Sequence, residues 1–336
     1  MNQSKNILRI GICSLLLLGL AACHQNPRTI DAEKTSQAQI SSTKEASSWK
    51  ASYSNLNNQV SSEEVKSLLS AHLDSRSVDD FFNLVNDYNT IVGSIGLSGD
   101  FSSFSKTEYD VEKISNLWKQ KKGDFVGTNC RINSYCLLKH SITIPKLEKN
   151  DDLLFLDNDA IDKGQVFDSK DKEEFDVLFS RVKTEATTDV KVHAEKMEKF
   201  FSQFQFNDKA RMLSVVLHDN LDGEYLFVGH VGVLVPADDG FLFVEKLTFE
   251  EPYQAIKFAT IEDCYKYLNT KYEDYTGEGL AKPFIMDNDK WVNLEKWYDM
   301  TVSLGLIFRL LMSWWVMSIV NSQKPRKNET FIAYIQ

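Results

Sequence analysis

Residues 225–235 have the sequence Tyr225-Leu226-Phe227-Val228-Gly229-His230-Val231-Gly232-Val233-Leu234-Val235. The stretch is rich in β-branched and aromatic residues, which favour strands. A turn follows at residues 237–240, and the chain returns through Phe241-Leu242-Phe243-Val244-Glu245-Lys246-Leu247. This pattern predicts a β-hairpin, and therefore an antiparallel sheet in the second half of the chain.

The segments on either side of the hairpin complete the expected fold. Residues 212–217 and 283–286 are strand-like, and Thr260 begins a helix that continues to about residue 272. The first half has helical periodicity. Its expected helices begin at Ser61 with a capping box, at Ser77 and at Tyr109, and continue over 130–139, 171–182 and 192–205, whereas 146–168 is loop-like. Helices followed by an antiparallel sheet predict an α+β fold.

The first 22 residues are typical of a bacterial signal peptide. Lys5 and Arg9 precede a short apolar run, which ends in Leu20-Ala21-Ala22-Cys23. This ending resembles a lipobox, in which the thiol of the cysteine is acylated before cleavage. We therefore expect a protein that is lipid-anchored to the cell membrane through Cys23 and faces the outside of the cell. The alternative is an ordinary signal peptide with an incidental cysteine.

Composition divides the rest of the chain. Residues 23–48 are polar and carry almost no large apolar side chains, which predicts a flexible linker. Residues 49–292 contain the apolar patterns, and we expect them to form one domain. The chain is 43% hydrophobic, enough for a sizeable core, and its net charge of −10 argues against nucleic acid as a partner.

Residues 293–336 form a hydrophobic C-terminal tail. Met300–Val320 is apolar except for Arg309 and a few hydroxyl residues, and basic residues follow it. Its length and flanking charge suit a membrane span, although a central arginine costs about 2.5–3.5 kcal/mol on an insertion scale. The alternative is a divergent tail with no selected structure. Both interpretations stay open.

The cysteines that remain after processing are odd in number. They are Cys130, Cys136 and Cys264, so at least one thiol stays unpaired outside the cytoplasm. Cys130 and Cys136 lie on different faces of one expected helix and cannot bond to each other without unwinding it. A disulfide from either one to Cys264 stays open.

The strongest chemical signal is Gly127-Thr128-Asn129-Cys130-Arg131-Ile132-Asn133 together with the distant His230. Thr128 or Asn129 would cap a helix and leave Cys130 in its first turn. There, unpaired N–H groups favour the thiolate and can stabilise an oxyanion on a substrate carbonyl. His230 on a strand is a rigid general base. The pair predicts a nucleophilic cysteine, against the alternative of two buried structural side chains.

The hairpin register supplies a third residue. Counting outward from the turn places Glu245 opposite Gly232 and diagonal to His230 on the same face, where its carboxylate could orient the imidazole. A slip of one residue would send Glu245 to the other face. The substitutes are Glu250, Asp219 and Asn220.

No cofactor or metal is expected. The histidines at 72, 140, 193 and 218 have no metal-ligand spacing with the cysteines. The sequence also lacks a glycine-rich phosphate loop and a Gly-x-Ser-x-Gly motif.

The arrangement resembles papain-like cysteine peptidases and amidases, including enzymes that cut cell-wall peptides. In that family a cysteine begins a helix, a histidine begins a strand, and a polar residue lies on the next strand. Two departures stand out: the stretch before Cys130 offers Asp124 and no glutamine for an oxyanion hole, and the third residue is an acid where papain has asparagine.

The chain is also similar, over about residues 50–292, to an uncharacterised bacterial lipoprotein family known as domain of unknown function 4300. The similarity rests on the segments 127–133, 230–233, 249–255 and 283–290. It implies no activity. The expected function is a lipid-anchored cysteine hydrolase with a papain-like core that acts on amide or peptide bonds, with the cell wall as one source of substrate. The alternative is a non-catalytic surface binding or adhesion lipoprotein with the same fold.

Overall fold

The structure is a computed structural model, and it describes residues 51–104 and 108–294. The signal peptide, Cys23, the linker and the Met300–Val320 segment lie outside the described residues. Within the described part of the chain, no helix is long and apolar enough to cross a membrane.

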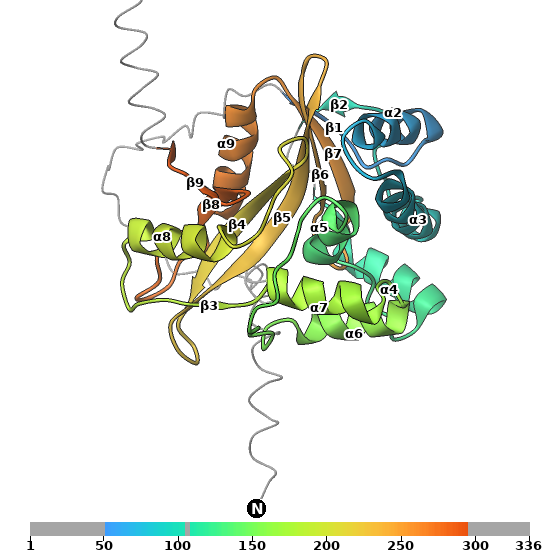
Figure 1. The fold of residues 1–336 in the computed structure, drawn as a ribbon. Helices are drawn as coiled ribbons and strands as arrows, with labels where there is room; N and C mark the ends of the chain where they lie inside the picture. The colour runs from blue at the N-terminus through green and yellow to red at the C-terminus, as the bar shows by residue number, and fades with distance from the viewer. Residues whose placement is uncertain (1–50, 105–107, 295–336) are drawn as a thin grey trace, which may run out of the picture. The chain divides into compact units, whose positions relative to one another are not determined.

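A nine-stranded sheet forms the centre of the described residues (Figure 1). Its strands pair antiparallel in the order β2-β1-β7-β6-β5-β4-β8-β9, and β3 pairs with β5 beside this path. Their bounds are β1 Ala51–Ser54, β2 Ser102–Ser103, β3 Val182–Lys183, β4 Arg211–Asp219, β5 Tyr225–Ala237, β6 Gly240–Lys246, β7 Tyr253–Phe258, β8 Phe284–Asp287 and β9 Lys290–Val292.

Eight helices are described. Their bounds are α2 Gln59–Ser70, α3 Ser75–Val92, α4 Val111–Lys122, α5 Cys130–Leu138, α6 Phe155–Gly164, α7 Ser169–Leu178, α8 Val190–Phe201 and α9 Ile261–Tyr272. All but α9 precede strands β4 to β9, and the predicted α+β class, with helices before an antiparallel sheet, is confirmed.

The helix caps show where local patterns were sufficient. Asn129 caps α5 and Thr260 caps α9, as predicted. The first helix begins earlier than expected, because the side chain of Asn58 accepts the backbone N–H of Ser61, so Ser61 is not the cap. The loop expected at 146–168 contains α6, which has no side-chain cap and therefore lacked a start signal.

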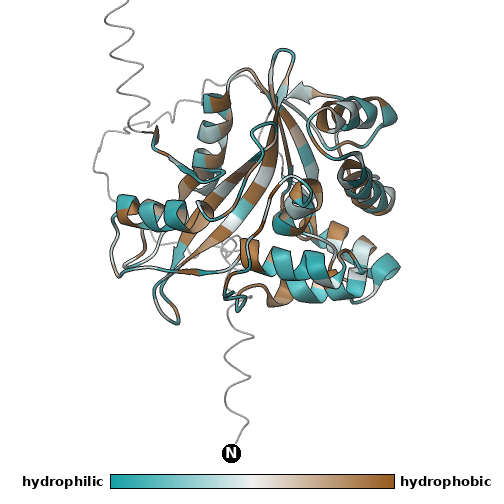
Figure 2. Ribbon diagram, viewed as in Figure 1, coloured by the Kyte–Doolittle hydropathy of each residue, from teal (hydrophilic) through white to brown (hydrophobic). Residues whose placement is uncertain are grey.

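The sheet separates two hydrophobic clusters. In Figure 2 the strands are mostly hydrophobic (brown), and the helices around them carry many hydrophilic residues (teal). The larger cluster joins the sheet to α2, α3, α5 and other N-terminal helices. The smaller cluster joins the opposite face to α9. In Figure 1, α5 and α9 lie on opposite sides of the sheet.

A β-bulge in β5 changes which residues face α9. His230 pairs with Val215 of β4, but the next pair is Val228 with Val216, so Gly229 is the extra residue. Val228 and Val231 both belong to the larger cluster, while Leu234 belongs to the α9 cluster. The bulge therefore puts Val228 on the same face as Val231, whereas His230 shares the α9 face with Leu234 by ordinary alternation from the turn.

Candidate functional site

Cys130 is the first residue of α5, at the point where an irregular segment becomes helical. The side chain of Asn129 accepts the backbone N–H of Ile132, at 3.0 Å. The first N–H groups of a helix have no intrahelical acceptor, so those of Cys130 and Arg131 stay available after Asn129 has taken one. Gly127 has a φ of 90°, and a Cβ there would approach the Trp118 ring to 3.3 Å. The turn before Cys130 thus requires glycine.

Thr128 anchors this turn and does not cap the helix. Its hydroxyl accepts from the Asn133 amide, at 2.9 Å, and bonds with the Tyr253 hydroxyl, at 3.3 Å. Tyr253 in turn donates to Asn133, at 3.0 Å. Because these side chains satisfy one another, they hold the turn against β7.

A buried ion pair supports the same helix start from α6. Arg131 donates to both oxygens of Asp157, at 2.9 and 2.7 Å, and Asn129 donates to Asp157 at 2.7 Å. A third Arg131 nitrogen donates to the Val228 carbonyl, at 3.0 Å. Asp157 therefore fixes both the cap and the residue that follows Cys130.

The structure brings Cys130 and His230 together. Their side chains are close enough for each to shift the pKa of the other, and His230 Nε2 lies 2.5 Å from Glu245 Oε2. Since Nε2 faces Glu245, Nδ1 is the ring nitrogen left for the thiol. Cys130 is 6% exposed, His230 1% and Glu245 2%.

The thiol approaches from the α5 side of the sheet, where the paired part of β5 and β6 ends. Their ladder ends at the pair Val233 and Val244. Beyond it, the Ser134 hydroxyl of α5 donates to the Val231 carbonyl, at 3.2 Å. Ser134 thus hydrogen-bonds to the carbonyl of a β5 residue that has no pairing partner on β6. The first turn of α5 lies against β5 here, and Cys130 meets His230.

Glu245 is the predicted third residue that reaches His230. Its other oxygen accepts the Tyr267 hydroxyl, and Lys271 Nζ lies 3.0 Å from Oε2. Of the substitutes, Glu250 contacts the Thr248 hydroxyl, Asp219 lies 4.0 Å from Arg181, and Asn220 donates to a loop carbonyl.

The charges favour a thiolate beside an imidazolium. Burial acts to raise the pKa of Cys130, but His230 and Arg131 outweigh it, and the pKa lies below its ordinary value. Burial and Lys271 act to lower the pKa of His230, yet Cys130 and Glu245 raise it above its ordinary value. For Glu245, burial is outweighed by Lys271, His230 and Tyr267, and the pKa falls to about 2.

Sequence reasoning missed the contribution of α9. Tyr267 and Lys271, one turn apart, hold Glu245, and the Tyr272 ring stacks on His230 with centroids 5.2 Å apart. Their spacing indicated only a common helix face. No local pattern showed that this face would meet β6.

Lys246 was missed as well, on the other face of β6. It is 1% exposed, and Nζ donates to the carbonyls of Thr248, at 2.8 Å, Phe249 and Glu251. Burial lowers the pKa of Lys246 to about 7. The side chain ties the 248–251 loop to the core next to Gly127, whose added Cβ would lie 3.5 Å from the Phe249 carbonyl.

The other two described thiols are in different surroundings. All three described cysteines are free, and none forms the disulfide to Cys264 that the sequence left open. Burial raises the pKa of Cys136 to about 12 and raises that of Cys264 well above its ordinary value. Burial therefore disfavours the thiolate, the nucleophilic form, at both positions. Within residues 51–104 and 108–294, no group of three or more His, Cys, Asp or Glu could hold a metal ion.

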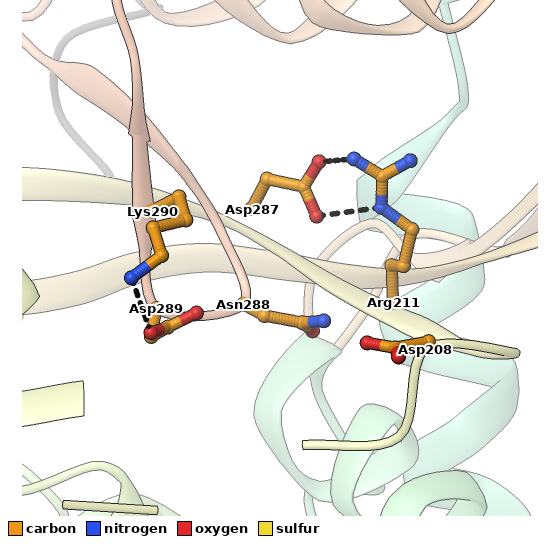
Figure 3. A pocket seen from close by; sticks show the side chains of 6 residues that line it. All are labelled: Asp208, Arg211, Asp287, Asn288, Asp289 and Lys290. Atoms are coloured by element: carbon orange, nitrogen blue, oxygen red, sulfur yellow. Dashed lines mark hydrogen bonds and ion pairs between the residues drawn. The ribbon is translucent and has the colours of Figure 1, made fainter. Parts of the chain in front are cut away.

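A separate cavity of about 420 Å³ lies beside β4 and the β8–β9 turn (Figure 3). Arg211 pairs with Asp287, and Lys290 pairs with Asp289 at 2.8 Å. The Asn288 side chain accepts the backbone N–H of Met212, at 2.8 Å. The contacts of Arg211 and Met212 fasten β8 to β4, and neither Cys130 nor His230 lines the cavity.

The family of the chain is defined by its sequence. The model of the family described as Domain of unknown function (DUF4300) matches residues 52–292, and the chain belongs to this family. No curated protein and no solved structure matches the chain.

Proposed function

We propose that the protein is a cysteine hydrolase that cleaves amide or peptide bonds at the bacterial cell surface, where Cys23 anchors it through lipid. One observation carries the proposal: Cys130, the first residue of a helix, lies buried beside His230, which hydrogen-bonds to Glu245. A papain-like core is part of the proposal, since Cys130 begins a helix and the polar Glu245 lies on the strand that follows the strand of His230.

The chemistry follows from this geometry. The Cys130 thiolate attacks the substrate carbonyl carbon, and the free N–H groups at the start of α5 stabilise the oxyanion. The His230 imidazolium gives its proton to the leaving amine, which breaks the amide bond and leaves a thioester. His230 then takes a proton from water, whose oxygen attacks the thioester and releases the acid and the Cys130 thiolate. Cell-wall peptides are the substrates that the proposed location offers.

The test is the rate at which iodoacetamide alkylates Cys130 near pH 6, followed by peptide mass spectrometry of the full chain. An ordinary thiol with a pKa of about 8.5 is then almost fully protonated. We therefore expect Cys130 to be alkylated about tenfold to a hundredfold faster in the natural sequence than in the His230→Ala variant. A second arm incubates the protein with purified peptidoglycan, and Cys130→Ala should abolish release of peptide fragments.

The alternative is a non-catalytic surface binding lipoprotein, and the low exposure of Cys130 and His230 favours it. It predicts slow alkylation of Cys130 that His230→Ala does not change, in a protein that stays folded. That result would overturn the hydrolase proposal.

A further inference from the structure

The His230–Glu245 pair is shared with a lysine. Lys271 Nζ lies 3.0 Å from the same Oε2 atom of Glu245 that faces His230 Nε2, and 3.0 Å from the Tyr267 hydroxyl. The Lys271 side chain is 26% exposed, whereas that of Glu245 is fully enclosed. The lysine therefore reaches inward from the end of α9 to a buried anion.

A buried carboxylate needs a compensating charge, because desolvation penalises an unpaired ion. His230 can supply that charge only while it is protonated. In the proposed reaction the imidazole must release its proton to the leaving group and later take one from water. Without a second cation, each proton release would leave Glu245 as an uncompensated buried anion, and His230 would tend to keep its proton.

We propose that Lys271 is a positioning residue that keeps Glu245 compensated in both charge states of His230, so that the imidazole can release its proton. The inference rests on the proposed function and adds a residue to it. Lys271 touches neither the thiol nor the scissile bond in this role, and it acts through Glu245.

Among the groups around His230, Lys271 is the lysine that shares the Glu245 oxygen with the imidazole. Cys130 approaches from α5, Glu245 from β6, and the uncharged Tyr272 ring from α9. The residue paired with it on β4 is Val215. Arg131 follows Cys130 but is engaged by Asp157. Lys271 lowers the pKa of His230, against the raising effects of Cys130 and Glu245.

The experiment measures the alkylation rate of Cys130 by iodoacetate against pH in the full chain. This reagent is an anion, so it reacts fastest while the thiolate stands beside the imidazolium. The rate falls when His230 loses its proton. This fall is the alkaline limb of the curve of rate against pH, and its midpoint follows the pKa of the imidazole. Lys271→Gln keeps a hydrogen-bond donor but removes the charge, and we expect it to move the alkaline limb up by about one pH unit. Lys271→Arg should keep the wild-type limb.

Lys266→Met is the matched control, because it removes one positive charge from α9 at a residue paired with Asp263 at 4.0 Å, and its limb should not move. Lys271→Met repeats the test if the glutamine variant is poorly folded. An alkaline limb that is identical in wild type, Lys271→Gln and Lys271→Met overturns this inference. A wild-type rate that does not depend on His230 overturns the proposed function instead, so the two failures are distinguishable.

Discussion

At the scale of single residues, the site depends on buried charges that are each matched. Glu245 is compensated by His230 and Lys271, and Asp157 by Arg131. Such pairs contribute little net stability, because desolvation offsets their attraction, but the loss of one partner leaves the other unpaired. The Arg131–Asp157 pair also fixes Asn129, so stability and site geometry depend on the same contact.

We expect Asp157→Asn to lower the free energy of unfolding by about 3 kcal/mol, because Arg131 would keep a buried charge without a counter-ion. Urea unfolding followed by circular dichroism measures this loss. Asp159→Asn, on the same helix, is the control: its pair with Lys163 is about half exposed, and we expect little change. Equal effects from the two substitutions would contradict the role assigned to Asp157.

At the scale of elements, the close approach of β5 and β6 determines whether Glu245 reaches His230. Gly232 is buried between them, and a Cβ there would lie 2.3 Å from the Phe243 ring and 2.8 Å from the Val244 carbonyl. The carbonyl belongs to the β6 backbone and cannot move aside alone. The residue must therefore be glycine for the two strands to keep this spacing.

Gly232→Ala should destabilise the domain by about 1–3 kcal/mol through overpacking and should also slow the alkylation of Cys130 near pH 6, because β6 carries Glu245 away from His230. Thermal unfolding and the iodoacetamide rate are the two measurements. Gly277→Ala is the matched control. It lies in an exposed loop, where the added Cβ would meet only the flexible Leu280 side chain, and neither quantity should change.

At the scale of the whole molecule, residues 52–292 form the family domain, while the proposed anchors lie before and after it. The two halves of the site come from opposite faces of one sheet: α5 carries Cys130, and α9 supports His230 and Glu245. Both faces must therefore be complete before the site exists, and we expect the domain to fold as one cooperative unit.

Membrane attachment can be assigned with four chains: the natural sequence, Cys23→Ala, a chain ending at residue 292, and both changes together. If lipid is the anchor, Cys23→Ala should leave an uncleaved precursor or release the protein from membranes. If Met300–Val320 spans the bilayer, release should require both changes. Fractionation and intact mass are the measurements. The chain with both changes is compared with the chain that only ends at residue 292. If the two bind membranes equally and differ in mass only by the substitution, the lipobox interpretation is contradicted.

Several features of the site could be predicted from the sequence alone. Asn129 was an expected cap, Cys130 was expected in the first turn, and the hairpin turn set the register that puts Glu245 on the same face as His230. These predictions succeeded because caps and tight turns are determined by residues a few positions apart. The bulge at Gly229 left this register intact, since it lies on the far side of His230 from the turn.

Only the tertiary structure could decide what supports these residues. Asp157 lies 28 residues from Asn129 in a helix without a cap signal, and Tyr267 lies 22 residues from Glu245. The sequence showed that Lys271 and Tyr267 share a helix face, but not which strand that face would meet. The same holds for the end of the β5–β6 ladder, beside which Cys130 reaches a histidine on the opposite face. Local chemistry determines caps and register, whereas the compensation of buried charge depends on which elements pack together.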